Sequence, residues 1–326
     1  MADFLAIVGP TASGKTGLSL EVAWRLDAEI ISMDSRQVYR GMDVGTAKVD
    51  AAARATVPHH GLDLLDPNER YSAGRFARDV RRWIREIHQR GHVPLLVGGT
   101  GFFLRALVEP IFTEPPLDAG RRESLRRWMR KQGRDRLATW VRRLDPERAD
   151  LAVAGGPQRM SRTLEVALLT GRPLSRWHRE APPDGEPLRG LVVVLEVPAE
   201  ELDRRISDRT RRMLAEGLLE EVRGLLDRGY GTGAPGMSGT GYRELARHLA
   251  GELTLEEALE LMERSTRRYA RRQRTWFRNQ LPEDADCVVR VDGTAPRQQQ
   301  LALVLDAWRK LERRPTTMTT GREEEE

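Results

Sequence analysis

The sequence is poor in cysteine and in long apolar runs. Among its 326 residues only Cys287 is a cysteine, which excludes an intramolecular disulfide framework and a cysteine-based zinc site. No stretch of about 18 apolar residues occurs, so we expect no membrane-spanning helix. The residues after Met1 show neither a basic start nor a long apolar core, which predicts that the protein is not secreted. We therefore expect a cytoplasmic protein.

Lysine is scarce as well, because almost all of the 54 basic residues are arginine. The 49 acidic residues leave a net charge of +5. Arginine makes the planar, bidentate and stacking contacts that suit phosphate and RNA. Arginine-rich helices are also common as solvated surface, so the charge alone leaves nucleic-acid binding open. The one histidine pair, His59–His60, lies at the start of an expected strand, and we assign it no metal.

The first third of the chain alternates strand-like and helix-like segments. Short apolar runs predict strands, and between them lie stretches with helical spacing, one of which Ser72 can cap. This β-α-β order predicts an α/β fold with a P-loop-type doubly wound parallel sheet. The expected strands are Phe4–Val8, Glu29–Met33, His60–Leu65 and Val93–Val97, and the capped helix has an apolar face of Phe76, Val80, Trp83, Ile84 and Ile87 and ends at Gly91.

The pattern becomes all-helical and arginine-rich near Thr113 and remains so to about Asp184. The buried-strand pattern then resumes at Leu191–Val197. We therefore expect an all-helical domain inserted into an α/β core. The expected division is a discontinuous core of residues 1–112 and 188–312, an insertion of residues 113–187, and an acidic tail of residues 313–326 that we expect to be disordered.

Two long helices and a glycine-rich loop are expected after the insertion. One helix spans about Glu200–Arg228, and the loop is Gly229–Gly241. The other begins after Thr254, because Thr254 and Glu257 have the spacing of a capping box. Its expected apolar stripe is Leu255, Leu259, Met262, Tyr269 and Trp276, and the last expected strand is Val288–Val291.

A phosphate-binding pattern occupies the first strand-to-helix turn. Its glycines let backbone amides point at phosphate oxygens, and the following helix presents its positive N-terminus to the anion. Lys15 supplies a point charge for the terminal phosphate, and the Thr16 hydroxyl suits Mg²⁺. A glycine-rich turn with an exposed lysine is the purely structural alternative. The residues that fit G-x-x-x-x-G-K-[ST] are Gly9, Pro10, Thr11, Ala12, Ser13, Gly14, Lys15 and Thr16.

The motif predicts phosphate binding but does not say which phosphate. A nucleoside triphosphatase usually has an aspartate at the end of a later strand, whereas Val93–Val97 ends in Gly98-Gly99-Thr100-Gly101. The best-placed carboxylate is Asp34, which follows the expected strand Glu29–Met33. In a parallel sheet this strand end faces the same crevice as the phosphate-binding loop. A helix-capping or turn aspartate would have the same sequence pattern.

Further segments follow in a fixed order over about residues 4 to 280. They are Gly9–Thr16, Asp34–Lys48, His59–Pro67, Tyr71–Ala73, Gly98–Thr100, Pro157–Glu165, Met213–Val222, Gly241–Leu245 and Thr266–Arg278. Taken together, they closely resemble the tRNA dimethylallyltransferase family, also called tRNA isopentenyltransferases. No single segment after the phosphate-binding motif is decisive, but the ordered set is highly specific.

The resemblance implies transfer of a dimethylallyl group from dimethylallyl diphosphate to the exocyclic amine of the adenosine 3′ of the anticodon. The implied acceptors are tRNAs that read codons beginning with U. The phosphate-binding loop of this family holds the donor diphosphate and no ATP is consumed, which agrees with the missing aspartate. The family implies Mg²⁺ held by Thr16, and Lys15 neutralising the leaving diphosphate. Asp34 is the candidate base for the amine proton.

The resemblance also implies a second diphosphate clamp and a set of tRNA contacts. The clamp is Arg209, for which an ordinary surface arginine is the alternative. Helical spacing puts Gln158, Arg162 and Glu165 on one face of a helix, whereas Met160, Leu164 and Ala167 face the core. The implied tRNA contacts are Asp34, Ser35, Arg36, Gln37, Thr100, Arg122, Gln158, Arg159, Met160, Ser161 and Arg162.

The sequence departs from the family pattern in two places. Gly155–Gly156 stand where the family often has Asn-Asp, and Ser238–Thr240 stand where it commonly has Gln-Ala-Ile, so we assign no role to either segment. Three alternatives stay open: a P-loop small-molecule or nucleotide kinase with a helical lid, an adenylate dimethylallyltransferase, and a non-catalytic RNA-binding protein. The large basic insertion favours a polymer substrate. We expect a monomer, because no segment has a coiled-coil pattern or an exposed apolar face.

Overall fold

The chain divides into two compact units, which we call the core unit and the helical unit. The computed structural model describes residues 2–113, 117–281 and 287–313. The core unit comprises residues 1–108 and 187–326, and the helical unit comprises residues 109–186. The sequence analysis expected the insertion at 113–187. The expected acidic tail lies, from residue 314 onward, outside the described residues.

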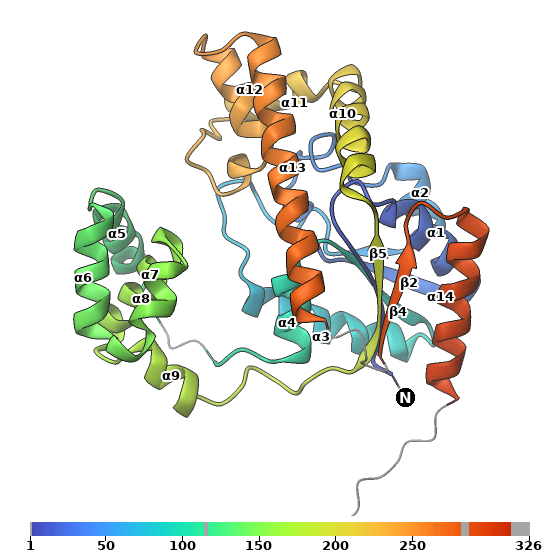
Figure 1. The fold of residues 1–326 in the computed structure, drawn as a ribbon, viewed down its shortest axis with the longest axis horizontal. Helices are drawn as coiled ribbons and strands as arrows, with labels where there is room; N and C mark the ends of the chain where they lie inside the picture. Colours follow the sequence, from blue (N-terminus) through green and yellow to red (C-terminus); the bar gives the residue numbers. More distant parts are fainter. Residues whose placement is uncertain (1, 114–116, 282–286, 314–326) are drawn as a thin grey trace, which may run out of the picture. The chain divides into compact units, whose positions relative to one another are not determined.

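A six-stranded parallel sheet forms the centre of the core unit, as Figure 1 shows. Its strand order is β3-β2-β4-β1-β5-β6, and every neighbouring pair is parallel. The prediction of a doubly wound parallel sheet is therefore confirmed. The carboxyl end of β1 lies where connections to the two halves of the sheet diverge, which is where such folds bind ligands. The strands are β1 (Phe4–Val8), β2 (Ala28–Ser32), β3 (His59–His60), β4 (Val93–Gly98), β5 (Gly190–Glu196) and β6 (Val288–Asp292).

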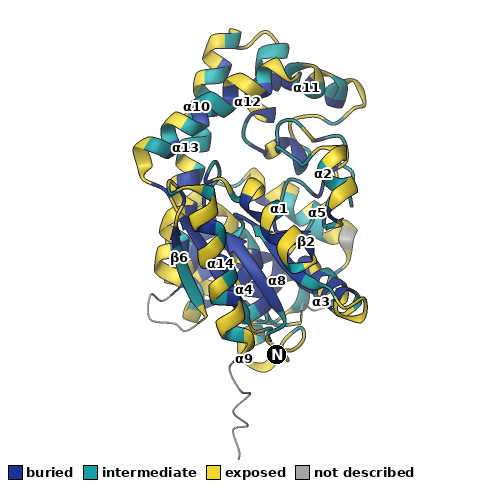
Figure 2. Ribbon diagram, turned by 90° about the vertical axis from the view of Figure 1, so that its right-hand side faces the viewer, coloured by how far each residue is buried: buried dark blue, intermediate teal, exposed yellow. Residues whose placement is uncertain are grey.

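Helices cover both faces of this sheet. α1 (Lys15–Leu26) and α14 (Arg297–Glu312) lie against one face, where Leu18 and Val22 meet Leu5 and Ile7 of β1. α3 (Ala73–Gln89) and α4 (Gly101–Val108) cover the other, since the crossover from β3 to β4 runs along the sheet in the opposite direction to that from β1 to β2, and right-handed crossovers then lie on opposite faces. Figure 2 shows dark blue strands beside α14, because both faces of the inner strands are buried, whereas the edge strand β6 is teal. The predicted face of α3, which comprises Phe76, Val80, Trp83, Ile84 and Ile87, is buried, and Ser72 caps the helix.

The predicted third strand is wrong beyond its first residue. β3 contains His59 and His60 only. Gly61 has φ +83, and a Cβ there would lie 2.9 Å from the carbonyl oxygen of Ser32. Asp63 also has a positive φ of 54°. Left-handed backbone cannot continue a ladder, so the chain leaves the sheet at Gly61 and runs through loops to α3.

The predicted helix at Glu200–Arg228 is two helices. α10 (Ala199–Ala215) ends at Glu216, and α11 (Leu218–Asp227) begins after Gly217, which has φ +95. Glycine adopts this left-handed conformation without the clash that a side chain causes, so it ends one helix and turns the chain into the next. The apolar spacing in the sequence continues on both sides of Gly217, so it predicted one continuous helix.

α13 (Leu255–Gln280) begins with the predicted capping box, because the Thr254 hydroxyl accepts from Glu257 N–H and the Glu257 carboxylate accepts from Thr254 N–H. Its buried residues differ from the predicted stripe except at Met262. Toward its C-terminal half the buried line moves to Ala270, Gln273 and Phe277, because there the helix packs over the loops at the carboxyl ends of the strands. The remaining core-unit elements are α2 (Ala51–Thr56), η2 (Gly236–Ser238) and α12 (Tyr242–Leu249).

The described part of the helical unit contains helices and a single isolated bridge between Phe112 and Pro183. Its core gathers Met129, Leu137, Val141, Met160 and Leu164. The all-helical pattern of the sequence is therefore observed. The helices are α5 (Ala119–Arg130), α6 (Arg134–Leu144), η1 (Pro146–Arg148), α7 (Ala149–Ala154), α8 (Pro157–Thr170) and α9 (Leu174–Glu180).

Within the described residues, no helix of either unit has the length and apolar character needed to cross a membrane.

Candidate active site

The loop between β1 and α1 forms a cradle of backbone amides. Gly9 has φ +154, and a Cβ there would lie 2.8 Å from the carbonyl oxygen of Leu195. Ala12 and Gly14 adopt φ values of 64° and 93°. Successive left-handed and right-handed residues turn neighbouring N–H groups to one side, and α1 follows directly with its positive end. The predicted motif therefore has the local backbone that an anion site requires.

Lys15 is the central cation of this cradle. Its Nζ donates to the carbonyl oxygens of Gly9 (3.0 Å) and Pro10 (2.6 Å). Burial, together with the positive charge of Arg209, lowers the pKa of Lys15 to about 7, although Asp34 acts in the opposite direction. A bound anion would raise this pKa again, because it stabilises the ammonium form. The site thus gains a full positive charge when a phosphate group arrives.

Arginines complete a cationic cavity of about 320 Å³ above the cradle. Arg205, Arg209 and Arg212 come from α10, and Arg297 comes from α14. Arg205 pairs with Glu201 at 2.6 Å, whereas no carboxylate of the described residues lies within ion-pair distance of Arg209 or Arg212. Burial lowers the pKa of Arg209, and Asp34 partly offsets this effect. The cavity is therefore prepared for an anion with several negative charges.

The sequence analysis found only one of these four arginines. The spacing of Arg205, Arg209 and Arg212 on one helix is i, i+4, i+7, which is a helix face that could have been recognised. No comparable signal exists for Arg297, since it lies 88 residues after Arg209 on another helix.

Asp34 follows the carboxyl end of β2, which β4 separates from β1 and the cradle, in the position the sequence predicted. Its Oδ1 accepts a hydrogen bond of 2.7 Å from the backbone N–H of Arg36. Its loop is bonded through Ser35 N–H to Thr100, and the adjacent Gly99 lies so near the cradle that a Cβ there would be 3.1 Å from the carbonyl oxygen of Gly9. The charge of Asp34 acts on the pKa values of Lys15, Arg209 and Tyr269. A carboxylate thus stands beside the anion cavity.

Thr100 and Tyr269 also belong to the surroundings of Asp34. The Thr100 hydroxyl accepts from the backbone N–H of Ser35 at 3.3 Å. Burial, followed by the charge of Asp34, raises the pKa of the Tyr269 phenol of α13 to about 12, and Thr100 acts in the opposite direction. Tyr269 is neutral at physiological pH and was expected only as part of an apolar stripe.

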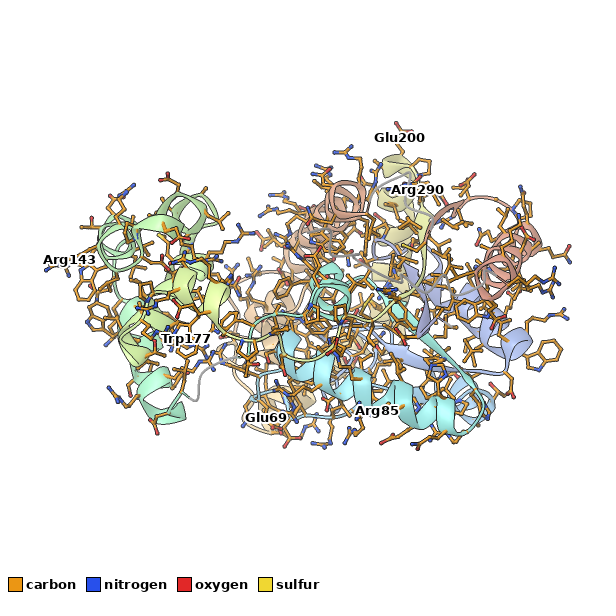
Figure 3. All side chains as sticks on the ribbon, turned by 90° about the horizontal axis from the view of Figure 1, so that it is seen from below. Glu69, Arg85, Arg143, Trp177, Glu200 and Arg290 are labelled. Carbon is orange, nitrogen blue, oxygen red and sulfur yellow. The ribbon has the colours of Figure 1, made fainter. Side chains whose placement is uncertain are left out.

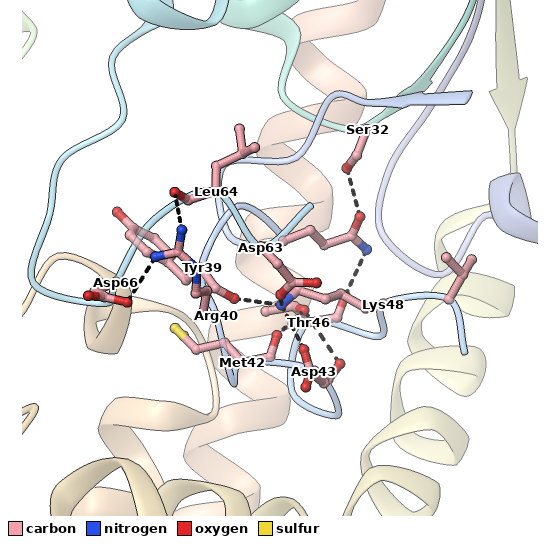
Figure 4. Close-up of polar contacts among 12 residues, drawn as sticks. Ser32, Tyr39, Arg40, Met42, Asp43, Thr46, Lys48, Asp63, Leu64 and Asp66 are labelled. Carbon is pink, nitrogen blue, oxygen red and sulfur yellow. Dashed lines mark hydrogen bonds and ion pairs between the residues drawn. The ribbon is translucent and has the colours of Figure 1, made fainter. Parts of the chain in front are cut away.

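Arg36 and Gln37, which were predicted to contact tRNA, contact the protein itself. Arg36 Nη1 donates to the carbonyl oxygen of Pro235 at 2.6 Å. Gln37 accepts from the Ser32 hydroxyl at 2.8 Å and donates to the carbonyl oxygen of Thr46 at 3.1 Å. The Gln37 amide is therefore engaged on both sides, as Figure 4 shows for Ser32 and Thr46.

The segment Asp34–Lys48 is held by a buried lysine. The Lys48 side chain is 1% exposed and its Nζ contacts the carboxylates of Asp43 (2.7 Å) and Asp63 (2.6 Å) and the carbonyl oxygen of Tyr39 (2.5 Å) (Figure 4). Burial alone would raise the pKa of Asp63, but hydrogen bonds from Lys48 and Arg54 bring it below its usual value. The ion pairs of Lys48 with Asp43 and Asp63 therefore hold the backbone conformation of the segment Asp34–Lys48.

Glu221 of α11 provides a further anchor for the same segment. Its carboxylate accepts from the backbone N–H groups of Asp43 (2.7 Å), Val44 (2.7 Å) and Gly45 (3.1 Å), and from the Tyr242 hydroxyl (2.6 Å). A Cβ on Gly45 would lie 2.5 Å from that hydroxyl oxygen. The segments Asp34–Lys48 and Met213–Val222, which the sequence analysis matched separately to the family, are therefore joined by hydrogen bonds to the Glu221 carboxylate.

In the helical unit, the predicted tRNA-facing helix is partly an ion-pair network. Glu165, expected on the exposed face, is 2% exposed and pairs with Arg122 (2.7 Å) and Arg162 (2.8 Å). The expectation for Glu165 is wrong, because Arg126 also pairs with this carboxylate and the three arginines enclose it.

The other predicted tRNA contacts of α8 differ in exposure. Met160, which was included among the tRNA contacts, is fully buried in the unit's core. Gln158 and Arg159 are exposed, Ser161 is half-buried, and Gly156 starts α8 with φ +82.

The fit of Mg²⁺ rests on Thr16, which is exposed at the first turn of α1 on the rim of the cavity. No group of three or more histidine, cysteine or acidic side chains able to hold a metal occurs in the ranges that the structure describes. Mg²⁺ is commonly held by one or two protein oxygens together with substrate phosphates and water. The Thr16 hydroxyl beside a phosphate cradle fits this kind of coordination.

Comparison with known proteins decides between the alternatives. The family model described as IPP transferase matches residues 37–280. The chain belongs to the IPP transferase family. A tRNA dimethylallyltransferase of Geobacter metallireducens is 44% identical over 272 residues, which cover 83% of this chain and 88% of the relative. One of Roseiflexus castenholzii is 45% identical over 293 residues, covering 87% and 94%.

A solved structure agrees with this membership. A eukaryotic dimethylallyltransferase acting on tRNA superposes with a TM-score of 0.79 at 26% identity, covering 98% of this chain and 82% of that one. The chain is therefore an enzyme of the transferase class, and the kinase, adenylate-modifying and non-catalytic alternatives are not supported. The expected resemblance is confirmed.

Proposed function

We propose that this protein transfers the dimethylallyl group of dimethylallyl diphosphate to the exocyclic amine of the adenosine 3′ of the anticodon. The products are N6-dimethylallyladenosine and diphosphate, and the acceptors are tRNAs that read codons beginning with U. Membership of the family and the names of its curated relatives support this activity. We propose further that the enzyme works as a monomer in the cytoplasm.

The observation that carries the proposal is a carboxylate beside an anion cavity. Asp34 lies near enough to Lys15 and Arg209 to act on both of their pKa values. Prenyl transfer needs this pairing, because a diphosphate leaves on one side of the allyl carbon while an amine attacks from the other.

The leaving group is stabilised by the cationic cavity. As the bond between the allyl carbon and the diphosphate oxygen breaks, negative charge grows on the diphosphate. Lys15, Arg209 and the N–H groups at the start of α1 are aimed at that charge, which lowers the energy of the transition state. Mg²⁺ held by Thr16 and the diphosphate oxygens would supply further Lewis-acid neutralisation there.

Asp34 is the proposed general base. An exocyclic adenine amine is a weak nucleophile, so the allyl carbon carries partial positive charge before the new C–N bond forms. The amine then has a proton to lose, and a carboxylate within reach accepts it. The hydrogen bond from Arg36 N–H holds one oxygen of Asp34 and leaves the other for this role.

The tRNA partner is supported by exposed arginines on both units. In the core unit, a cavity of about 420 Å³ runs along α13 between Arg268, Arg271 and Arg272 and contains Trp276. In the helical unit, Arg143 of α6 points away from the unit's interior, as Arg85 of α3 does in the core unit (Figure 3). Arginines suit phosphate and stacked bases, and a single-stranded loop can splay its adenine at modest cost.

The test combines purified protein, Mg²⁺, radiolabelled dimethylallyl diphosphate and unmodified tRNA in which adenosine follows the anticodon. Digestion of the tRNA and separation of its nucleosides should place the label on that adenosine, and Lys15→Ala should abolish it. Absence of label together with ATP-dependent phosphate transfer in a parallel reaction would refute the proposal and support the kinase. Free AMP tested in the same way distinguishes an adenylate-modifying enzyme.

A further inference from the structure

A buried glutamine joins two loops of the active site. Gln273 of α13 is 7% exposed. Its side-chain oxygen accepts from the backbone N–H of Thr11 at 2.8 Å, and its side-chain nitrogen donates to the carbonyl oxygen of Gly99 at 2.8 Å. Thr11 belongs to the phosphate cradle and Gly99 to the loop after β4. A buried amide is costly unless both of its ends are satisfied, and here each end serves a different loop.

The Gly99–Thr100 loop is bonded in turn to the loop that carries the proposed base. The Thr100 hydroxyl accepts from the backbone N–H of Ser35 at 3.3 Å. Tyr269, one turn before Gln273 on the same side of α13, has Thr100 among the groups that act on its pKa. α13 therefore contacts the cradle and the Gly99–Thr100 loop through Gln273, and Thr100 connects them to the Asp34 loop.

Two glycines after β4 are required by this helix. A Cβ on Gly99 would lie 2.2 Å from the Gln273 side-chain nitrogen, and a Cβ on Gly101 would lie 2.1 Å from a ring carbon of Trp276. Both distances are shorter than non-bonded atoms reach. A side chain at residue 101 would therefore collide with the rigid Trp276 ring, and one at residue 99 would displace the Gln273 amide. In the sequence these glycines stood where a triphosphatase would have an aspartate. Their structural role is to admit the glutamine and the tryptophan.

We propose that Gln273 is a positioning residue that keeps the diphosphate cradle in register with the loop of the proposed base. This inference rests on the proposed prenyl transfer. Both functional groups of the amide are bound to protein backbone, so Gln273 acts through Thr11 and Gly99 and touches no substrate. Transfer requires the allyl carbon to lie between the leaving diphosphate and the amine. A small shift of one loop against the other lowers the rate more than it weakens binding of either substrate.

Two substitutions test this role. Gln273→Glu keeps the acceptor for Thr11 N–H but places an oxygen opposite the Gly99 carbonyl. Gln273→Met keeps the length of the side chain and removes both hydrogen bonds, so it is the variant to measure if the carboxylate prevents folding. We expect each to lower kcat by about 10- to 100-fold at saturating tRNA, with less than about a threefold change in KM for dimethylallyl diphosphate.

Glu29→Gln is the control. Glu29 lies near the start of β2, at the edge of the sheet opposite the cradle, and is 3% exposed. Its carboxylate accepts from Arg90 at 2.7 and 2.8 Å and is hydrogen-bonded to His60 at 2.7 Å, so the glutamine variant also disturbs a buried polar group. We expect a loss of thermal stability but a kcat within about twofold of the parent enzyme.

The affinity for inorganic diphosphate, measured by calorimetry, reports separately on the cradle. It should stay within about threefold of the parent value in both Gln273 variants. Equal kcat losses in Gln273→Glu and Glu29→Gln, or a loss of diphosphate affinity as large as the loss of kcat, overturn the positioning role. A parent enzyme without transfer activity overturns the proposed function instead, so the two failures are distinguishable.

Discussion

Replacement of Arg209 by methionine should stabilise the protein and impair substrate binding. The guanidinium lies in the cavity beside Lys15 and Arg212, and no carboxylate of the described residues is within ion-pair distance. Burial and the charge of Arg212 both lower its pKa, which means that the folded protein disfavours its positive charge. Methionine fills a similar volume without that charge. We expect the free energy of unfolding to rise by about 1–2 kcal/mol.

The same substitution removes a charged donor for the diphosphate. A hydrogen bond to a charged group contributes about 1.5–3 kcal/mol, which corresponds to roughly a 10- to 150-fold change in binding. We therefore expect KM for dimethylallyl diphosphate and Kd for diphosphate to rise by about that factor. The pKa of Lys15 should also rise above its value of about 7, because Arg209 is one cause of its lowering.

Urea unfolding, calorimetric titration with diphosphate and steady-state kinetics measure these effects. Arg211→Met is the control, since Arg211 is 75% exposed and does not itself line the cavity, although its partner Asp208, 2.6 Å away, does. It should change stability and KM little. A loss of stability in Arg209→Met combined with unchanged diphosphate affinity would refute the reasoning, since Arg209 would then be a structural residue.

Three other predictions concern the base, the anchor and the lysine. Asp34→Asn keeps the oxygen that accepts from Arg36 N–H, so we expect tRNA affinity in a filter-binding assay to be retained and the single-turnover transfer rate to fall by about 10²- to 10⁴-fold. Equal losses of tRNA affinity and transfer rate would contradict the role of Asp34 as a general base. Glu221→Gln leaves fewer acceptors for four donors and should cost about 2–4 kcal/mol of stability in urea, whereas Tyr242→Phe should cost about 1 kcal/mol; equal costs would argue against the shared carboxylate. The pKa of Lys15 is about 7 in the folded protein and 10.5 in the unfolded chain, so between these pH values the unfolded chain binds more protons. Without a bound anion, the free energy of unfolding should therefore rise with pH across this range, and Lys15→Met should abolish the rise. If the substitution leaves the pH dependence of stability unchanged, the lysine titrates normally in the folded protein.

Local patterns in the sequence were enough for the cradle and the order of the fold. Gly9, Gly14, Lys15 and Thr16 lie within eight consecutive residues, so the spacing of the glycines, the ammonium and the hydroxyl alone predicts the anion site. The strand-and-helix alternation likewise predicted a parallel sheet, because buried strands are apolar on both faces. The place of Asp34 after the carboxyl end of β2 was also predicted, because strand ends of a parallel sheet meet at one edge, whereas its role as a base stays a prediction. The spacing of Thr254 and Glu257 predicted the start of α13 for the same local reason.

Contacts between segments far apart in the chain were decided only by the tertiary structure. Arg297 reaches the cradle from a helix that begins 283 residues after Gly14, and Gln273 bonds Thr11 across 262 residues. The sequence assigned Arg122 and Glu165 to an RNA-facing surface, but folding buries the carboxylate and pairs it with that arginine. A charged residue has the same hydropathy whether it meets RNA, a salt-bridge partner or water. Its partner is determined by the packing of helices, which residue types and spacing along one segment do not specify.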